Sequence, residues 1–158
     1  MMQKPSINAR MAGALRKFAE GPPDRLDPRL ARVLEGGLAE ESGCIFLSAL
    51  ANGYNPSLRE RLDGTGLECF VNHFHVENRV PGPLPYQLGQ AVLFAKGLGL
   101  LLEGSYPGII FRIIVSQNDQ GTIIRFHKVR SGESYLDANL ENYKDEAVWT
   151  CLTSVPSR

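Results

Sequence analysis

Hydrophobic and polar residues follow two different periods along the chain, and these predict helices first and strands later. Between Ile7 and Phe18 apolar residues recur every three or four positions, which is typical of an amphipathic helix with Ser6 as its N-cap. GlyProPro at 21–23 ends this helix. Asp27 followed by Pro28 favours the start of a second helix, because an aspartate caps free backbone amides and a proline fits the first turn.

The middle of the chain is predicted to contain one long helix among several shorter elements. Residues 42–50 are apolar enough for a buried helix, although a run this short also fits a strand. Residues 56–63 favour a short polar helix, and 67–77 has the aromatic and β-branched content of a strand. After a proline-rich connector, 86–102 is predicted as a long buried helix whose glycines let it approach a sheet closely.

The C-terminal third is rich in strand-forming residues. Residues 109–116 and 122–129 are two such runs joined directly by a polar loop, which predicts an antiparallel hairpin. A short helix or helical turn at 136–143 and a last strand at 147–153 follow. The sequence therefore predicts an α+β fold with a mostly antiparallel sheet of about four strands and helices packed on one face. We expect a single domain over 1–158, whose first 40 residues form a helical extension packed on it.

Composition limits the possible partners and compartments. The 158 residues hold 17 basic and 17 acidic side chains, so the chain lacks the excess of positive charge that draws proteins to nucleic acid or to anionic membranes. The N-terminus has no continuous apolar region of the signal-peptide type, and the apolar stretch 84–102 is interrupted by proline, glutamine, lysine and glycine. Cys44, Cys69 and Cys151 have no metal-type spacing and are expected to be reduced, buried thiols. We expect a cytoplasmic protein.

Three histidines offer one candidate chemistry. His73 and His75 are two residues apart in a predicted strand, so they share a face, and His127 lies in the predicted hairpin. Together with Glu77 they could ligate zinc or iron, as a metal-binding protein or a metal-dependent enzyme would require. Ordinary strand histidines have the same pattern, so this hypothesis needs a register that brings His127 beside the pair.

A nucleophile or a phosphate-binding loop is not predicted. Cys69 shares the predicted strand face with His73, but four residues of strand separate them by about 13 Å, too far for a nucleophile and its base. The glycine pairs at 64–66 and 97–99 lack the strand-loop-helix context and the spacing of a phosphate site. We therefore predict no enzyme and no cofactor.

An acidic segment near the C-terminus offers a second candidate. Between residues 133 and 146 five carboxylates face one lysine, a net charge of −4. In the predicted helix, Asp137 and Glu141 are four residues apart and share a face, with tyrosines nearby. An ordinary solvated helix has this pattern, and so does a docking surface for a basic protein such as a cytosolic nuclease. The candidate partner-binding residues are Tyr135, Asp137, Glu141, Tyr143, Asp145 and Glu146.

Basic residues gather in two other places. The hairpin carries Arg112, Arg125, Lys128 and Arg130, of which the first two are expected to pair with the acidic segment across the sheet. Residues 1–32 hold seven basic and three acidic side chains. This local excess is typical of a solvated helical face, and the alternative is a regulatory or scaffold domain that binds through its N-terminal helices.

From Asn52 to Trp149 the sequence resembles small immunity proteins of bacterial polymorphic toxin systems, especially those of contact-dependent growth inhibition. The resemblance rests on the sequences GYNP at 53–56, ECFVNH at 68–73, FRIIV at 111–115, RFHKVR at 125–130 and GESYL at 132–136 with the acidic stretch that follows. It implies a cytoplasmic antitoxin without catalysis that binds one cognate toxin C-terminal domain, expected to be a nuclease, and blocks its active site or substrate surface. It implies no direct contact with nucleic acid or membrane.

Overall fold

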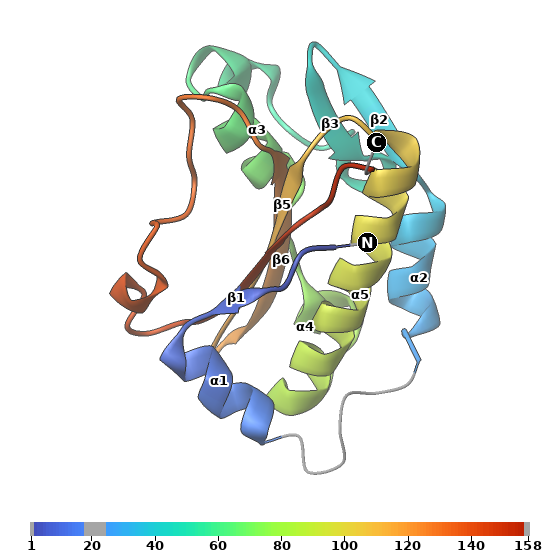
Figure 1. Ribbon diagram of the computed structural model, residues 1–158. Coiled ribbons are helices and arrows are strands. Elements are labelled where there is room, and N and C mark those ends of the chain that lie inside the picture. Colours follow the sequence, from blue (N-terminus) through green and yellow to red (C-terminus); the bar gives the residue numbers. More distant parts are fainter. Residues whose placement is uncertain (1, 18–24, 157–158) are drawn as a thin grey trace.

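The computed structural model describes residues 2–17 and 25–156, and a five-stranded sheet forms the centre of this part of the chain (Figure 1). The strands lie in the order β1-β7-β5-β6-β4, and all neighbouring pairs are antiparallel. Their bounds are β1 Ser6–Ile7, β4 Phe74–His75, β5 Phe111–Asn118, β6 Gly121–Lys128 and β7 Ala147–Leu152. The predicted hairpin is confirmed by β5 and β6. Its turn is shorter than predicted, because the two strands pair as far as Asn118 and Gly121.

The helices confirm the predicted α+β class. The long helix α5 packs against β5 and β6 on one face of the sheet. The sheet has five strands rather than about four because β1 adds a short edge strand. The helices are α1 Ala9–Arg16, α2 Pro28–Glu35, α3 Gly64–Val71, α4 Val76–Arg79 and α5 Leu84–Ser105, with the 3-10 turns η1 Ser48–Leu50, η2 Pro56–Glu60 and η3 Leu140–Asn142. Among the described residues no helix has the length and apolar content needed to cross a bilayer.

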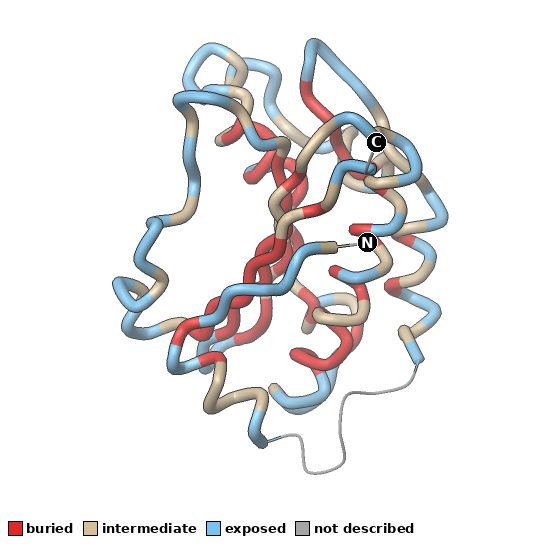
Figure 2. The backbone as a smooth tube through the Cα atoms, in the orientation of Figure 1, coloured by how far each residue is buried: buried red, intermediate tan, exposed pale blue. Residues whose placement is uncertain are grey.

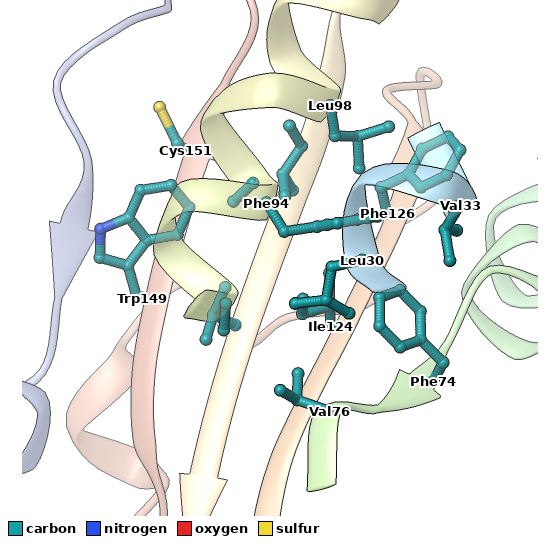
Figure 3. Packing of buried hydrophobic residues seen from close by; sticks show 14 of the residues in the cluster. Leu30, Val33, Phe74, Val76, Phe94, Leu98, Ile124, Phe126, Trp149 and Cys151 are labelled. Carbon is teal, nitrogen blue, oxygen red and sulfur yellow. The ribbon is translucent and has the colours of Figure 1, made fainter. Parts of the chain in front are cut away.

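Alternate residues of β5, β6 and β7 point to opposite faces of the sheet, and we call the face toward α5 the helix face. It is mainly apolar. Phe126 and Trp149 pack there around Phe94 of α5, and all three are buried (Figure 3). The Phe74 ring meets Phe94 edge to face at 5.1 Å between centroids. Burial of these aromatic side chains supplies much of the hydrophobic stabilisation of the fold.

The opposite face, which we call the segment face, carries the intervening residues of the same strands. Arg112 of β5 and His127 of β6 are register partners there, and Leu152 of β7 continues their row. The next row contains Arg125 and Thr150. Within residues 2–17 and 25–156 no long helix covers this face. Figure 1 shows that the irregular chain between β6 and β7 runs beside it.

The N-terminal residues are integrated into the fold rather than added to it. Ser6 and Ile7 pair with β7, so the helix predicted from Ile7 begins only at α1. Its N-cap is Asn8 instead of Ser6, with the side-chain oxygen accepting a 3.0 Å hydrogen bond from the amide of Met11. Asp27 and Pro28 begin α2 as predicted. Both helices bury side chains in the same cluster as the sheet. The predicted stop at 21–23 lies outside the described residues.

Two predictions for the middle of the chain are corrected by the structure. Residues 42–50, predicted as a buried helix with a strand as the alternative, contain the strand β3 Cys44–Leu47, which forms a separate hairpin with β2 Leu38–Glu41 and is followed by η1. The strand predicted at 67–77 is wrong, because α3 extends to Val71 and only Phe74–His75 is β-structure. Asp63 caps this helix by accepting from the amide of Gly66 at 2.7 Å.

The helix α3 is required there because its polar side chains join the edges of two sheets. The Glu68 carboxylate is fully buried and accepts from the amides of Ile45 in β3 at 2.7 Å and Lys128 in β6 at 2.8 Å. It also pairs with Arg130 at 2.6 Å. Asn72 donates to the carbonyl of Ile45 and accepts from Leu47. A strand would separate these two side chains by about 13 Å, whereas a helix places them one turn apart, so tertiary hydrogen bonds override the local β-propensity.

The short helix or helical turn predicted at 136–143 is a single turn that covers only part of this range. Only Leu140–Asn142 forms one 3-10 turn. The side chains of Asp137 and Asn139 each accept a hydrogen bond from the amide two residues further on, at 2.9 and 3.1 Å. Such bonds compete with helical ones. The acidic residues therefore lie on an irregular segment.

Candidate functional site

The candidate partner-binding residues all lie on the chain that connects β6 to β7, which we call the cover segment and define as residues 129–146. It is longer than most connections in compact domains, and long connections of this kind are commonly functional. Figure 2 shows it as mostly exposed. A buried sheet face lies on one side of it and solvent on the other.

The buried side chain of Asn8 anchors the C-terminal half of the cover segment to the body of the protein. Asn8, which is 3% exposed, donates its side-chain amide to the carbonyls of Leu140, Tyr143 and Glu146 at 3.4, 3.3 and 2.8 Å. Its side-chain oxygen also accepts from the amide of Val148 at the start of β7. The cap of α1 therefore also fixes the cover segment.

Two of the predicted acidic residues are themselves held in place. Asp137 accepts from the side chain of Asn142 at 2.8 Å, and its amide donates to the Tyr143 hydroxyl at 2.8 Å. The bonds from Asn142 and from the Asn139 amide lower the pKa of Asp137. Glu141 accepts from the amide of Ala9 at 2.7 Å, where the N-terminus of α1 favours negative charge. Both carboxylates remain exposed.

The six predicted residues do not form one continuous patch. Tyr135 and Asp137 line a pocket of about 380 Å³ between the cover segment and the segment face. The other hollow, of about 590 Å³, is lined in part by Tyr143, Asp145 and Glu146. Glu141 lines neither pocket and caps α1. The acidic residues thus share a segment without sharing a helical face.

In the described part of the chain, the basic hairpin residues do not form the predicted ion pairs with the acidic segment and contact other groups. Arg125 donates to the hydroxyl of Tyr135 and lies 5.1 Å from the centre of its ring, so it reaches the cover segment through an aromatic residue. Arg130 pairs with Glu68. Arg112 donates to the hydroxyl of Thr150 at 3.2 Å. No described ion pair joins Arg112 or Arg125 to an acidic residue of the cover segment.

The predicted metal ligands are not brought together. His75 bonds Glu77 at 3.0 Å, whereas His73 bonds the carbonyl of Phe70 at 2.6 Å. His75 pairs in register with Ile123, and His127 is four residues further along that strand, about 13 Å away. Across residues 2–17 and 25–156 no group of three histidine, cysteine or acidic side chains is placed to hold a metal ion.

The cysteines agree with the interpretation as buried thiols. Cys44, Cys69 and Cys151 are free and buried. Burial raises the pKa of Cys69 to about 12. A thiol with so high a pKa is protonated at neutral pH and is a poor nucleophile.

Sequence reasoning missed the group of polar residues under the cover segment. Arg112, His127 and Thr150 line the 380 Å³ pocket from the strands. The signal for Arg112 and His127 was their shared position in the hairpin, because a shorter turn makes them direct neighbours. The loop predicted at 116–121 was too long to fix that register. Thr150 lies in this pocket because β5 pairs with β7, and the sequence does not indicate that pairing.

Comparisons with known proteins place the chain in a family. No solved structure matches it. A protein of Pasteurella multocida (strain Pm70), described as "Uncharacterized protein PM0498", is 31% identical over 106 residues. That match covers 60% of this chain and 65% of the relative, less than two thirds of the relative's length. Residues 6–154 match the family described as "Uncharacterized protein PM0498 family", and so the chain belongs to that family.

Proposed function

We propose that the protein is an immunity protein that binds a basic toxin domain through the cover segment and occludes its active site or substrate surface. The observation that carries this proposal is the anchoring of an acidic, irregular segment by Asn8. A nuclease domain is the expected target, because an enzyme that holds phosphates presents a basic surface. The resemblance to immunity proteins supports the same class of partner.

Preorganisation makes the cover segment suited to tight binding. A flexible loop loses conformational freedom when it binds, and this loss weakens the complex. Here the backbone is already held by the Asn8 side chain and by the bond from the Asp137 amide to the Tyr143 hydroxyl. Tyr135 is 43% exposed, so it is available as an aromatic anchor. Exposed carboxylates around such an anchor steer a basic partner toward it.

Asp145 and Glu146 are the best residues for a test of this surface. Neither side chain makes a described hydrogen bond or ion pair, so their replacement leaves the anchoring intact. The Asn8 bond uses the backbone carbonyl of Glu146, which a substitution retains. Asp137 and Glu141 are less suitable because both accept hydrogen bonds within the protein.

The experiment measures association with the C-terminal domain of a toxin encoded beside this chain. We expect a one-to-one complex that suppresses the toxin's activity. Asp145→Lys with Glu146→Lys should slow association at least tenfold at low salt and make its salt dependence shallower. The matched control is Glu35→Lys with Glu60→Lys, which changes the net charge equally at α2 and η2 and should leave association within about twofold.

Two results would contradict the proposal. Failure of the two proteins to form a complex, with toxin activity unchanged, rejects the immunity function. Equal slowing by the two double variants means that net charge alone attracts the partner, and then the cover segment is not the binding surface.

A further inference from the structure

The pocket of about 380 Å³ under the cover segment is built from both polar and apolar side chains. The strands supply Arg112, His127 and Thr150, and the cover segment supplies apolar side chains that include Leu136 and Leu140. Its volume lies at the lower end of the range for small-molecule sites, about 300–1,000 Å³. A pocket of this size accepts a ligand of a few to about a dozen heavy atoms.

His127 lines this pocket and has a buried nitrogen without a partner. The residue is 4% exposed, and its Nδ1 lies 2.9 Å from the carbonyl of Lys128, so Nδ1 carries the proton and donates. In the neutral ring Nε2 is then an acceptor. Among the described residues, Nε2 is the one buried side-chain nitrogen or oxygen that has no hydrogen-bond partner. A buried polar atom without a partner destabilises the folded protein, and a ligand that bonds it can recover this loss.

Arg112 provides a positive charge beside that nitrogen. The two residues are register partners on adjacent strands. Arg112 donates one bond to the hydroxyl of Thr150, and no described carboxylate forms an ion pair with it. A guanidinium has five N–H donors, so most of them remain for a ligand. Guanidinium groups bind carboxylates and phosphates through paired hydrogen bonds.

The charges around the pocket select a single negative charge over a double one. Glu133 and Asp137 also line it, and both would repel a dianionic phosphate. A carboxylate carries one charge and a planar pair of oxygens, which fits a guanidinium. The apolar side chains of the cover segment then face the carbon body of the ligand.

We propose that this pocket binds the carboxylate group of a small organic acid, with Arg112 holding its oxygens and His127 Nε2 sharing a proton with it. At neutral pH the acid is ionised, and binding takes one proton from solvent onto Nε2. A new N–H bond forms, and the charged imidazole donates to a carboxylate oxygen. The inference does not rest on the immunity proposal, although Tyr135 and Asp137 belong both to the lining of this pocket and to the proposed toxin-binding residues.

The surrounding charges set the proton balance of His127. Burial first, then Arg112 and Arg130, lower the pKa of this histidine, whereas the Lys128 carbonyl and Glu68 of α3 oppose that shift. The free protein therefore holds His127 neutral at pH 7. An anion beside Nε2 favours the charged ring, so binding and proton uptake are coupled and affinity should fall as pH rises.

The test uses benzoate as the probe and benzamide as its neutral counterpart of the same shape. Titration calorimetry in two buffers of different ionisation enthalpy measures the proton uptake, which should approach one per benzoate at pH 7. The ¹⁵N resonance of His127 Nε2 should move from the unprotonated to the protonated position. We expect benzamide to bind at least tenfold more weakly, and inorganic phosphate to bind more weakly than benzoate.

Variants locate the site. Arg112→Gln should lower benzoate affinity at least tenfold, and Arg29→Gln on α2, which also removes one positive charge, should leave it unchanged. Equal binding of benzoate and benzamide, absence of proton uptake, or insensitivity to Arg112→Gln would overturn the proposal. Tighter binding of phosphate than of benzoate would reject the organic acid. These measurements require only Arg112→Gln and the unmodified protein. The proposal can therefore be tested even if His127 variants fail to fold.

Discussion

The two faces of the central sheet are formed by the same strands but have different roles. On β6, Phe126 points to the helix face and is fully buried, whereas its neighbours Arg125 and His127 point to the segment face. The helix face is apolar in the two rows that contain Ile113 and Val115, and the regular helix α5 covers it. Its row of Gln117 and Thr122 bonds Gln87 of α5. The segment face is polar in its rows near Arg112 and is covered by irregular chain. Stability is thus concentrated on one face, and the candidate binding groups lie on the other.

The sharpest test of this comparison replaces two adjacent residues of β6. Phe126→Ala should lower the free energy of unfolding by about 3–5 kcal/mol, because it removes a fully buried ring and leaves a cavity beside Phe111. Arg125→Ala should lower it by less than about 1 kcal/mol, because this side chain is partly exposed and contacts Tyr135 at the surface. Urea unfolding followed by circular dichroism measures both. Similar losses for the two variants would mean that the faces contribute equally to stability.

The second test concerns the anchor of the cover segment. Asn8→Ala should lower the free energy of unfolding by about 2–3 kcal/mol, because it removes the cap of α1 and leaves buried carbonyls without a donor. Asn142→Ala is the control, since that exposed side chain makes one bond to Asp137. It should cost less than about 1 kcal/mol. Hydrogen exchange should also speed up across residues 137–146 in the Asn8 variant. Unchanged exchange there would show that other contacts hold the segment.

The sequence predicts most of the helix face and little of the segment face, for a physical reason. Long runs of apolar residues identify α5 and the β5–β6 hairpin, because a continuous buried surface requires apolar side chains at regular positions of one segment. The region 67–77 has the composition of a strand, yet it forms α3 because Glu68 and Asn72 serve backbone groups from two other strands. Such long-range hydrogen bonds leave no local pattern.

The candidate site shows the same limit. The acidic residues are visible in composition, but their arrangement depends on Asn8, more than 130 positions away along the chain. The helical spacing assumed for Asp137 and Glu141 does not exist, because side-chain bonds at Asp137 and Asn139 take the place of helical bonds. The pocket beneath is defined by register and by β-strand pairing, which hydrophobic periods do not specify.

The smallest expected effect is the dependence of stability on pH, and it isolates the segment face. Burial lowers the pKa of His127 below its ordinary value of 6.5 in the folded protein. Above pH 6.5 the residue is neutral in both states and costs nothing. As pH falls below 6.5 the unfolded chain takes up a proton that the folded protein resists, so stability decreases toward the folded pKa. One group contributes a slope of at most about 1.4 kcal/mol per pH unit.

His127→Gln should flatten that slope between pH 6.5 and pH 5, because glutamine does not titrate. The control His73→Gln removes an imidazole whose Nδ1 bonds the Phe70 carbonyl near the surface, and it should leave the slope in place. Urea unfolding at several pH values measures the difference between the variants, which cancels the shared contribution of the carboxylates. An identical slope in His127→Gln and the unmodified protein would show that His127 takes up a proton as readily in the folded protein as in the unfolded chain. His127 would then not be the buried, neutral acceptor on which the pocket depends.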